Sequence, residues 1–162
     1  MSEIKEKAGK KELLAVEETA LQDISGVLQA MDTMEEYEPF SVIRGGKELF
    51  SFRVCGLDDE EMEKCRTEAT KLVKNKKLGG MTMPSDFNAA KYNSLLIVTA
   101  THPKDREFLW DNKDLQKKAK AVTAWQVVDR VLRAGEKERV IELIEKLSGY
   151  DEDGLEEVVK NS

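Results

Sequence analysis

Few side chains in this sequence could serve as a nucleophile and its base. The chain has one histidine, His102, and two cysteines, Cys55 and Cys65. A cysteine next to a histidine can form a nucleophilic thiolate, but only if the fold brings the two within hydrogen-bonding reach. His102 precedes Pro103 at a predicted helix end, where a surface histidine commonly caps backbone groups. We therefore interpret His102 as a capping residue and expect no catalytic residue.

Metal and phosphate sites also lack their characteristic patterns. One histidine excludes a histidine-rich metal site, and the spacing of the two cysteines does not match that of zinc ligands. In the acidic run 151–154 the glycine comes too early for an EF-hand loop, so an acidic helix start is favoured. The GxGxxG, GxxxxGK[ST], HExxH and GxSxG patterns are absent. We expect no cofactor, no metal and no enzymatic activity.

The composition is that of a charged, acidic globular protein. The 162 residues suit one domain, with 40% hydrophobic and 36% charged residues and a net charge of -6. A pI of about 5.1 argues against nucleic acid as a partner, because phosphate binding needs clustered Lys and Arg. The N-terminus lacks a signal-peptide pattern, and no apolar run approaches the about 20 residues that span a membrane. We expect a cytoplasmic protein with both thiols reduced.

The elements that would position these residues are mainly helices. Two runs rich in Phe, Val and Ile flank Gly45-Gly46, which predicts a β-hairpin with a primed turn at residues 38–54. Helices are predicted from the spacing of apolar residues at about 13–36, 58–78, 86–100, 105–110, 111–133 and 140–147, with a last short helix at 151–160. In this interpretation Lys71, Lys74, Lys76 and Lys77 mark a helix C-terminus, and Ser85 caps the next helix.

The predicted fold is therefore mainly α with one β-hairpin (α+β): a compact helical domain of about five to six helices over residues 21–162. Residues 1–20 are predicted to be a charged N-terminal tail or a frayed helix.

A narrow apolar stripe in the first predicted helix is the candidate binding site. Leu21, Ile24, Leu28 and Met31 recur at spacings of three and four. Such a stripe ordinarily packs on the protein's own core, and the alternative is that it docks in a partner's groove. The sequence leaves both interpretations open.

Three long segments resemble the XkdN-like family of phage tail assembly chaperones, found in bacteriophages and prophages of Gram-positive bacteria. The segments are LFSFRVCGLDDEEMEKCRTEATK, FNAAKYNSLLIVTATHPKDREFLWDNKDLQ and AWQVVDRVLRAGEKERVIELIEKLSGYD. Residues 21–31, LQDISGVLQAM, resemble the family's N-terminal helix. The charged first twenty residues depart from the family pattern.

The resemblance implies a small helical protein without a catalytic residue or cofactor. Such chaperones are thought to coat the long helical tape-measure protein, keep it soluble and hand it over to tail tube subunits in the host cytosol. We therefore expect a chaperone that binds the tape-measure protein and promotes tail tube assembly, and self-association is left open. The alternative function is a structural tail or adaptor component of the virion. An enzyme and a DNA-binding regulator are disfavoured by the missing motifs and the low pI.

Overall fold

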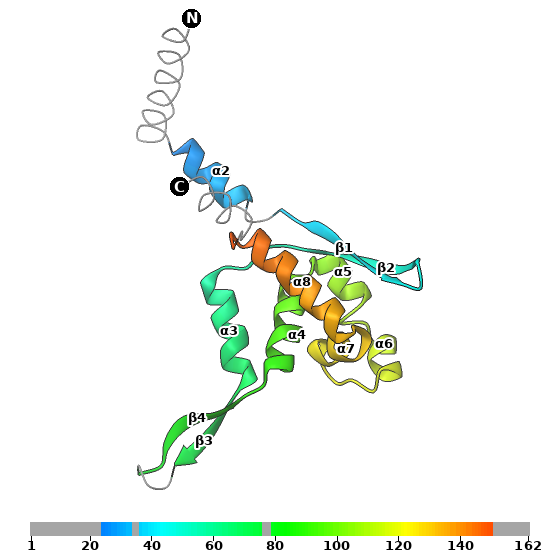
Figure 1. Ribbon diagram of the computed structural model, residues 1–162. Helices are drawn as coiled ribbons and strands as arrows, with labels where there is room; N and C mark the ends of the chain where they lie inside the picture. Colours follow the sequence, from blue (N-terminus) through cyan, green and yellow to red (C-terminus); the bar gives the residue numbers. More distant parts are fainter. Residues whose placement is uncertain (1–23, 34–35, 76–78, 151–162) are drawn as a thin grey trace, which may run out of the picture. The chain divides into compact units, whose positions relative to one another are not determined.

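A computed structural model describes residues 24–33, 36–75 and 79–150 (Figure 1). The chain divides into one unit that ends at Glu36 and a second that begins at Tyr37. In the first unit the described element is helix α2 (Ser25–Thr33). The second unit holds the two hairpins and the remaining helices. The predicted tail, residues 1–20, and the predicted helix at 151–160 lie outside the described residues.

The hairpin predicted around Gly45-Gly46 is confirmed. Strand β1 (Glu38–Arg44) pairs antiparallel with β2 (Lys47–Val54). Both turn glycines have positive φ, 61° and 74°, the backbone that a two-residue primed turn requires. The side chains that face the helices are apolar: Val42, Phe52 and Val54 are buried, with Phe40 and Phe50 packed against them.

A second hairpin replaces the predicted long helix over residues 58–78, and that prediction is wrong. Helix α3 (Asp59–Ala69) begins at a capping box formed by Asp58 and Glu61 but ends at Ala69. The chain then forms β3 (Thr70–Asn75), which pairs antiparallel with β4 (Met81–Phe87). Gly79 and Gly80, with φ of 69° and 84°, turn the chain before β4.

This second hairpin corrects two further predictions. Lys71 and Lys74 lie in a strand and do not mark a helix C-terminus. Ser85 also lies in a strand, and the next helix, α4 (Ala89–Ala100), is capped by Asn88, whose side chain accepts from the Lys91 N–H at 3.0 Å.

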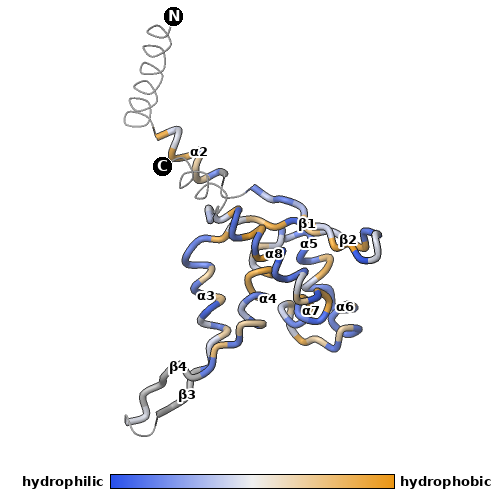
Figure 2. The backbone as a smooth tube through the Cα atoms, viewed as in Figure 1, coloured by the Kyte–Doolittle hydropathy of each residue, from blue (hydrophilic) through white to orange (hydrophobic). Residues whose placement is uncertain are grey.

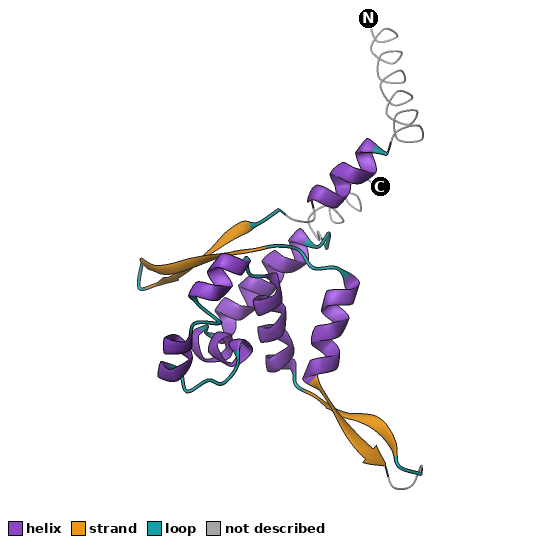
Figure 3. Ribbon diagram, turned by 180° about the vertical axis from the view of Figure 1, so that it is seen from behind, coloured by secondary structure: helices purple, strands orange, loops and turns teal. Residues whose placement is uncertain are grey.

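Helix α4 is the centre of the second unit. It is buried from Ser94 to Val98 and again at Ala100, and it packs against α3 on one side and α7 (Ala124–Val131) and α8 (Ala134–Leu147) on the other (Figures 1 and 3). The hydropathy colouring distinguishes the two helices: apolar positions are concentrated along α4 and polar ones along α3 (Figure 2). Ser148 and Gly149 end α8, as predicted, and Gly149 has a φ of 97°.

The segment 111–133 forms two helices where one was predicted. Helix α6 (Lys113–Lys118) stops before Lys120, which has a φ of 53°, and α7 starts anew after a Thr123 capping box. With α5 (Pro103–Phe108), the described residues contain seven helices, slightly more than the predicted five to six. The fold class, mainly α with a β-hairpin, is confirmed.

Candidate partner-binding surface

Helix α2 presents an apolar stripe to solvent within its own unit. Ile24, Val27, Leu28 and Met31 keep 51–70% of their surface exposed. The Leu28 N–H donates to the Ile24 carbonyl at 2.9 Å, so the helical turn extends back to Ile24 and aligns it with the stripe. Residues three and four apart lie on one face of a helix. We call these four side chains the α2 stripe.

The structure describes three of the four residues that the sequence analysis assigned to the stripe. Ile24, Leu28 and Met31 lie on the exposed apolar face, and Leu21 lies outside the described residues. The sequence analysis missed Val27, which is three residues after Ile24 and four before Met31. The full helical spacing of i, i+3, i+4 and i+7 would have found it. Their part in partner binding stays a prediction.

The β1–β2 hairpin is fixed to α8 by an ion pair between the half-buried Arg44 and the buried Glu136. Arg44 donates from Nε and Nη2 to the two carboxylate oxygens of Glu136, at 3.1 and 2.6 Å. Arg44 also donates to the Val131 carbonyl at 2.8 Å, and the Arg133 N–H donates to Glu136 at 2.8 Å. Glu136 is 3% exposed, and the Arg44 hydrogen bonds lower the pKa of its carboxyl to about 2. The pair therefore stays ionised at neutral pH and holds the hairpin at this corner.

A second polar cluster closes the outer edge of β2 against α5. Arg53 pairs with Asp105 through Nε and Nη2, each at 3.0 Å, and its backbone N–H donates to the same carboxylate at 2.8 Å. The hydrogen bonds from Arg53 lower the pKa of the Asp105 carboxyl. The His102 N–H donates to the Arg53 carbonyl at 2.8 Å, so this end of the strand has its backbone groups paired. An edge satisfied in this way is less able to recruit a foreign strand.

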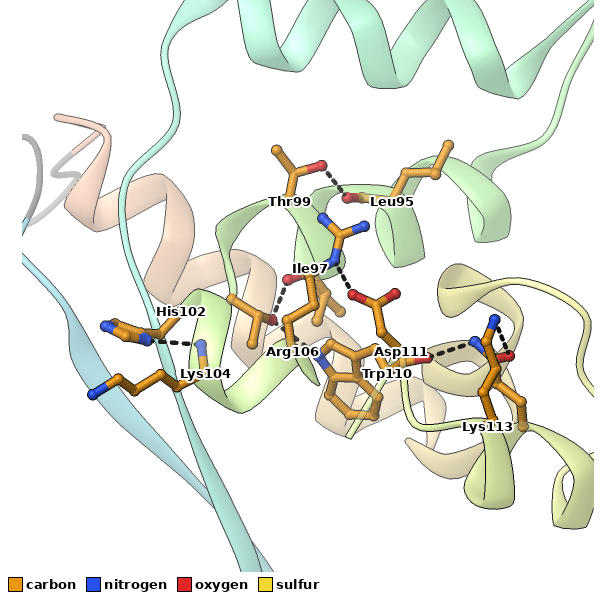
Figure 4. Close-up of polar contacts among 11 residues, drawn as sticks. Leu95, Ile97, Thr99, His102, Lys104, Arg106, Trp110, Asp111 and Lys113 are labelled. Carbon is orange, nitrogen blue, oxygen red and sulfur yellow. Dashed lines mark hydrogen bonds and ion pairs between the residues drawn. The ribbon is translucent and has the colours of Figure 1, made fainter. Parts of the chain in front are cut away.

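His102 has the capping role that the sequence predicts. Its Nδ1 accepts a hydrogen bond from the Lys104 N–H at 3.1 Å, at the start of α5 (Figure 4). Its ring also packs edge-on against Tyr37, with centroids 4.7 Å apart. An Nδ1 that accepts this bond is unprotonated in the neutral ring, so the proton is on Nε2.

Neither cysteine forms a disulfide, and the buried one, Cys65, has a polar contact in the core. Cys65 Sγ lies 3.5 Å from Thr99 Oγ1. Burial raises the pKa of the Cys65 thiol, which keeps it protonated and makes it a weak nucleophile. The contacts of Cys65 and His102 described above therefore serve packing and capping.

No three His, Cys, Asp or Glu side chains in the described ranges gather closely enough to hold a metal ion. None of the described helices is both long and apolar enough to cross a bilayer.

Comparison with known proteins gives one family match. The model of the family described as Phage XkdN-like tail assembly chaperone protein matches residues 24–161. No curated protein matches the chain. Among solved structures, the crystal structure of the protein yqbn is similar at 16% identity and a TM-score of 0.44, over 72% of this chain and 88% of that one. A TM-score below 0.5 does not establish a shared fold.

Proposed function

Because this chain belongs to the XkdN-like family of phage tail assembly chaperones, we propose that it binds the tape-measure protein through the α2 stripe and promotes tail tube assembly, without a catalytic step. The family match runs from residue 24, so the described stripe lies within the matched region. The chaperone acts in the bacterial host cytosol, which agrees with two free thiols and a low pI.

The exposed α2 stripe is the observation that carries this proposal. An amphipathic helix buries its apolar face on its own core or on a partner, and here four apolar side chains are more than half exposed. A helical client would present apolar side chains at the same spacing of three and four residues. Burial of about 100 Å² of apolar surface at each of several such side chains would contribute about 2–3 kcal/mol apiece before ordering costs. The stripe is therefore large enough to hold a helix, and charge elsewhere on the chain keeps the complex soluble.

Co-expression with the tape-measure protein tests the stripe with a charge-matched pair of variants. Leu28→Glu adds one carboxylate to the apolar face, and Gln29→Glu adds one to the neighbouring polar face of the same helix turn. We expect the wild type and Gln29→Glu to keep the client soluble, and Leu28→Glu to lose most of that effect. Thermal unfolding should be alike in both variants, because both positions are exposed.

Two outcomes oppose the proposal. If the client is equally soluble without this chain, the chaperone function is refuted. If Leu28→Glu protects the client as well as Gln29→Glu does, the α2 stripe is not the contact. Mass spectrometry of purified particles separates a chaperone, which leaves the particle, from an adaptor component, which stays.

A further inference from the structure

The α2 stripe lies in a long stretch of sequence that contains acids but no bases. The 32 residues from Glu12 to Ile43 include eight carboxylates and no lysine, arginine or histidine. The rest of the chain holds all 26 lysines and arginines together with 24 carboxylates, so it carries a small positive net charge. The overall charge of -6 therefore originates in residues 12–43, which we call the acidic stretch.

In the described part of this stretch, a carboxylate borders the apolar stripe. Asp32 lies four residues after Leu28 and directly after Met31, so it is next to the stripe on the helix surface. Asp32 and Glu36 are both exposed, and neither forms an ion pair with a described residue. Helix α2 itself contains no lysine or arginine. The surroundings of the stripe are therefore negative, without a cation to balance them.

This charge distribution discriminates among helices that could dock on the stripe. A helix that docks through apolar residues three and four positions apart places its flanking positions along the borders of the contact. Lysine or arginine at those positions meets the carboxylates of the acidic stretch. Glutamate or aspartate meets the same carboxylates and finds no cation there, and such juxtaposed like charges oppose docking.

We propose that the helical segment docked on the α2 stripe is cationic, with lysine or arginine flanking its apolar positions. This inference rests on the proposed function, and it specifies which parts of a long helical client the chaperone occupies. Apolar burial supplies most of the affinity, while the charges set the choice of segment and the rate of encounter. Because the carboxylates are exposed, the preference should weaken at about 1 M salt, where the Debye length is only about 3 Å.

A pair of synthetic peptides tests the preference. Both peptides have leucines at helical spacings of three and four residues, and they differ only at the flanking positions, which are lysine in one and glutamate in the other. Fluorescence anisotropy of each labelled peptide, titrated with the whole 162-residue chain, gives the two dissociation constants. We expect the lysine peptide to bind at least about tenfold more tightly at about 0.05 M salt, and the ratio to fall toward one at about 1 M.

Three variants separate docking on the stripe from general attraction to an acidic protein. Leu28→Glu makes the chain more acidic, so general attraction predicts tighter binding of the lysine peptide, whereas docking on the stripe predicts weaker binding. Asp32→Asn with Glu36→Gln removes two exposed carboxylates of the first unit and should lower the preference for the lysine peptide by about threefold or more. Glu138→Gln with Glu142→Gln makes the same change in net charge at exposed positions of α8 and should leave the preference unchanged.

The inference is overturned if the glutamate peptide binds as tightly as the lysine peptide, if neither binds, or if Leu28→Glu binds the lysine peptide more tightly than the wild type does. It is also overturned if the α8 variant loses the preference as fully as the first-unit variant. Sedimentation velocity of the chain alone checks a second copy as the occupant: association of the wild type that Leu28→Glu abolishes would replace the cationic helix with that copy.

The client assay fails separately from the peptide assay. If protection of the client depends on Leu28 while the two peptides bind alike, the stripe is the client contact and the preference for a cationic helix is refuted. If the lysine peptide binds as expected but the client is equally soluble without this chain, the chaperone function is refuted and the binding preference stands.

Discussion

Replacing Arg44 with leucine should cost the protein much of its stability at neutral pH. The substitution leaves the Glu136 carboxylate buried without its cation, while the apolar stem of the residue is kept. The arginine hydrogen bonds hold the pKa of Glu136 at about 2, against 4.5 for an ordinary glutamate. Since one pKa unit corresponds to about 1.4 kcal/mol, the whole shift corresponds to about 3 kcal/mol, of which the Arg44 hydrogen bonds are the largest contribution and the Arg133 N–H supplies a smaller one. Loss of one partner of a buried pair typically costs about 3–5 kcal/mol.

The cost of the Arg44 substitution should depend on pH in a definite direction. The folded-state pKa of Glu136 lies below the unfolded one, so the stabilisation is fully present above pH 4.5 and is lost as the pH falls toward 2. The variant lacks this contribution at every pH. The difference in unfolding free energy between wild type and variant should therefore shrink by more than about 1 kcal/mol between pH about 7 and pH about 3.5.

Urea unfolding, followed through the fluorescence of the fully buried Trp110, measures these differences. The double variant Arg44→Leu/Glu136→Gln completes a double-mutant cycle and should recover part of the loss, because no buried charge is left unpaired. If the difference in unfolding free energy between wild type and Arg44→Leu is the same at both pH values, the ion pair does not stabilise the fold in the way argued here. The same conclusion follows if the single variant is no less stable than the double one.

Three further substitutions give sharp expectations. Gly56→Ala should lower the free energy of unfolding by about 1–3 kcal/mol in a urea titration, because the new Cβ would lie 2.6 Å from the Leu147 carbonyl carbon. Trp110→Phe should cost about 1–3 kcal/mol in a urea titration followed by circular dichroism, since it removes the 3.0 Å hydrogen bond from Trp110 Nε1 to Thr101 Oγ1 in the core. Gly26→Ala should stabilise α2 by about 1 kcal/mol and slow amide exchange there, because the added Cβ meets nothing within 4 Å. Faster amide exchange in Gly26→Ala, or an unchanged free energy of unfolding in Gly56→Ala or Trp110→Phe, would contradict these expectations.

Elements that are specified by residues a few positions apart could be predicted from the sequence. Two glycines with positive φ between β-branched and aromatic runs specify the first hairpin. Asp58 and Glu61 specify the start of α3 through reciprocal hydrogen bonds across three residues. The apolar spacing of the α2 stripe could be read in the same way, since three and four residues place side chains on one helix face.

The second hairpin shows where local signals failed. Leu72 continues the apolar spacing of Cys65 and Ala69, which favours a helix. The structure instead pairs residues 70–75 with 81–87, a segment that includes Pro84 and carries little strand signal of its own. The competition between helix and strand was settled by hydrogen bonds to that second segment, which no single window of sequence contains.

The sequence by itself determined the mainly helical fold class, the first hairpin, the capping role of His102 and the apolar spacing of α2, since each depends on residues a few positions apart. The tertiary structure alone decided which surfaces are buried, exposed or charged. Arg44 and Glu136 are 92 residues apart and make contact only when the hairpin packs on α8. Contacts of that range depend on how the whole chain buries its apolar surface, which local spacing does not encode.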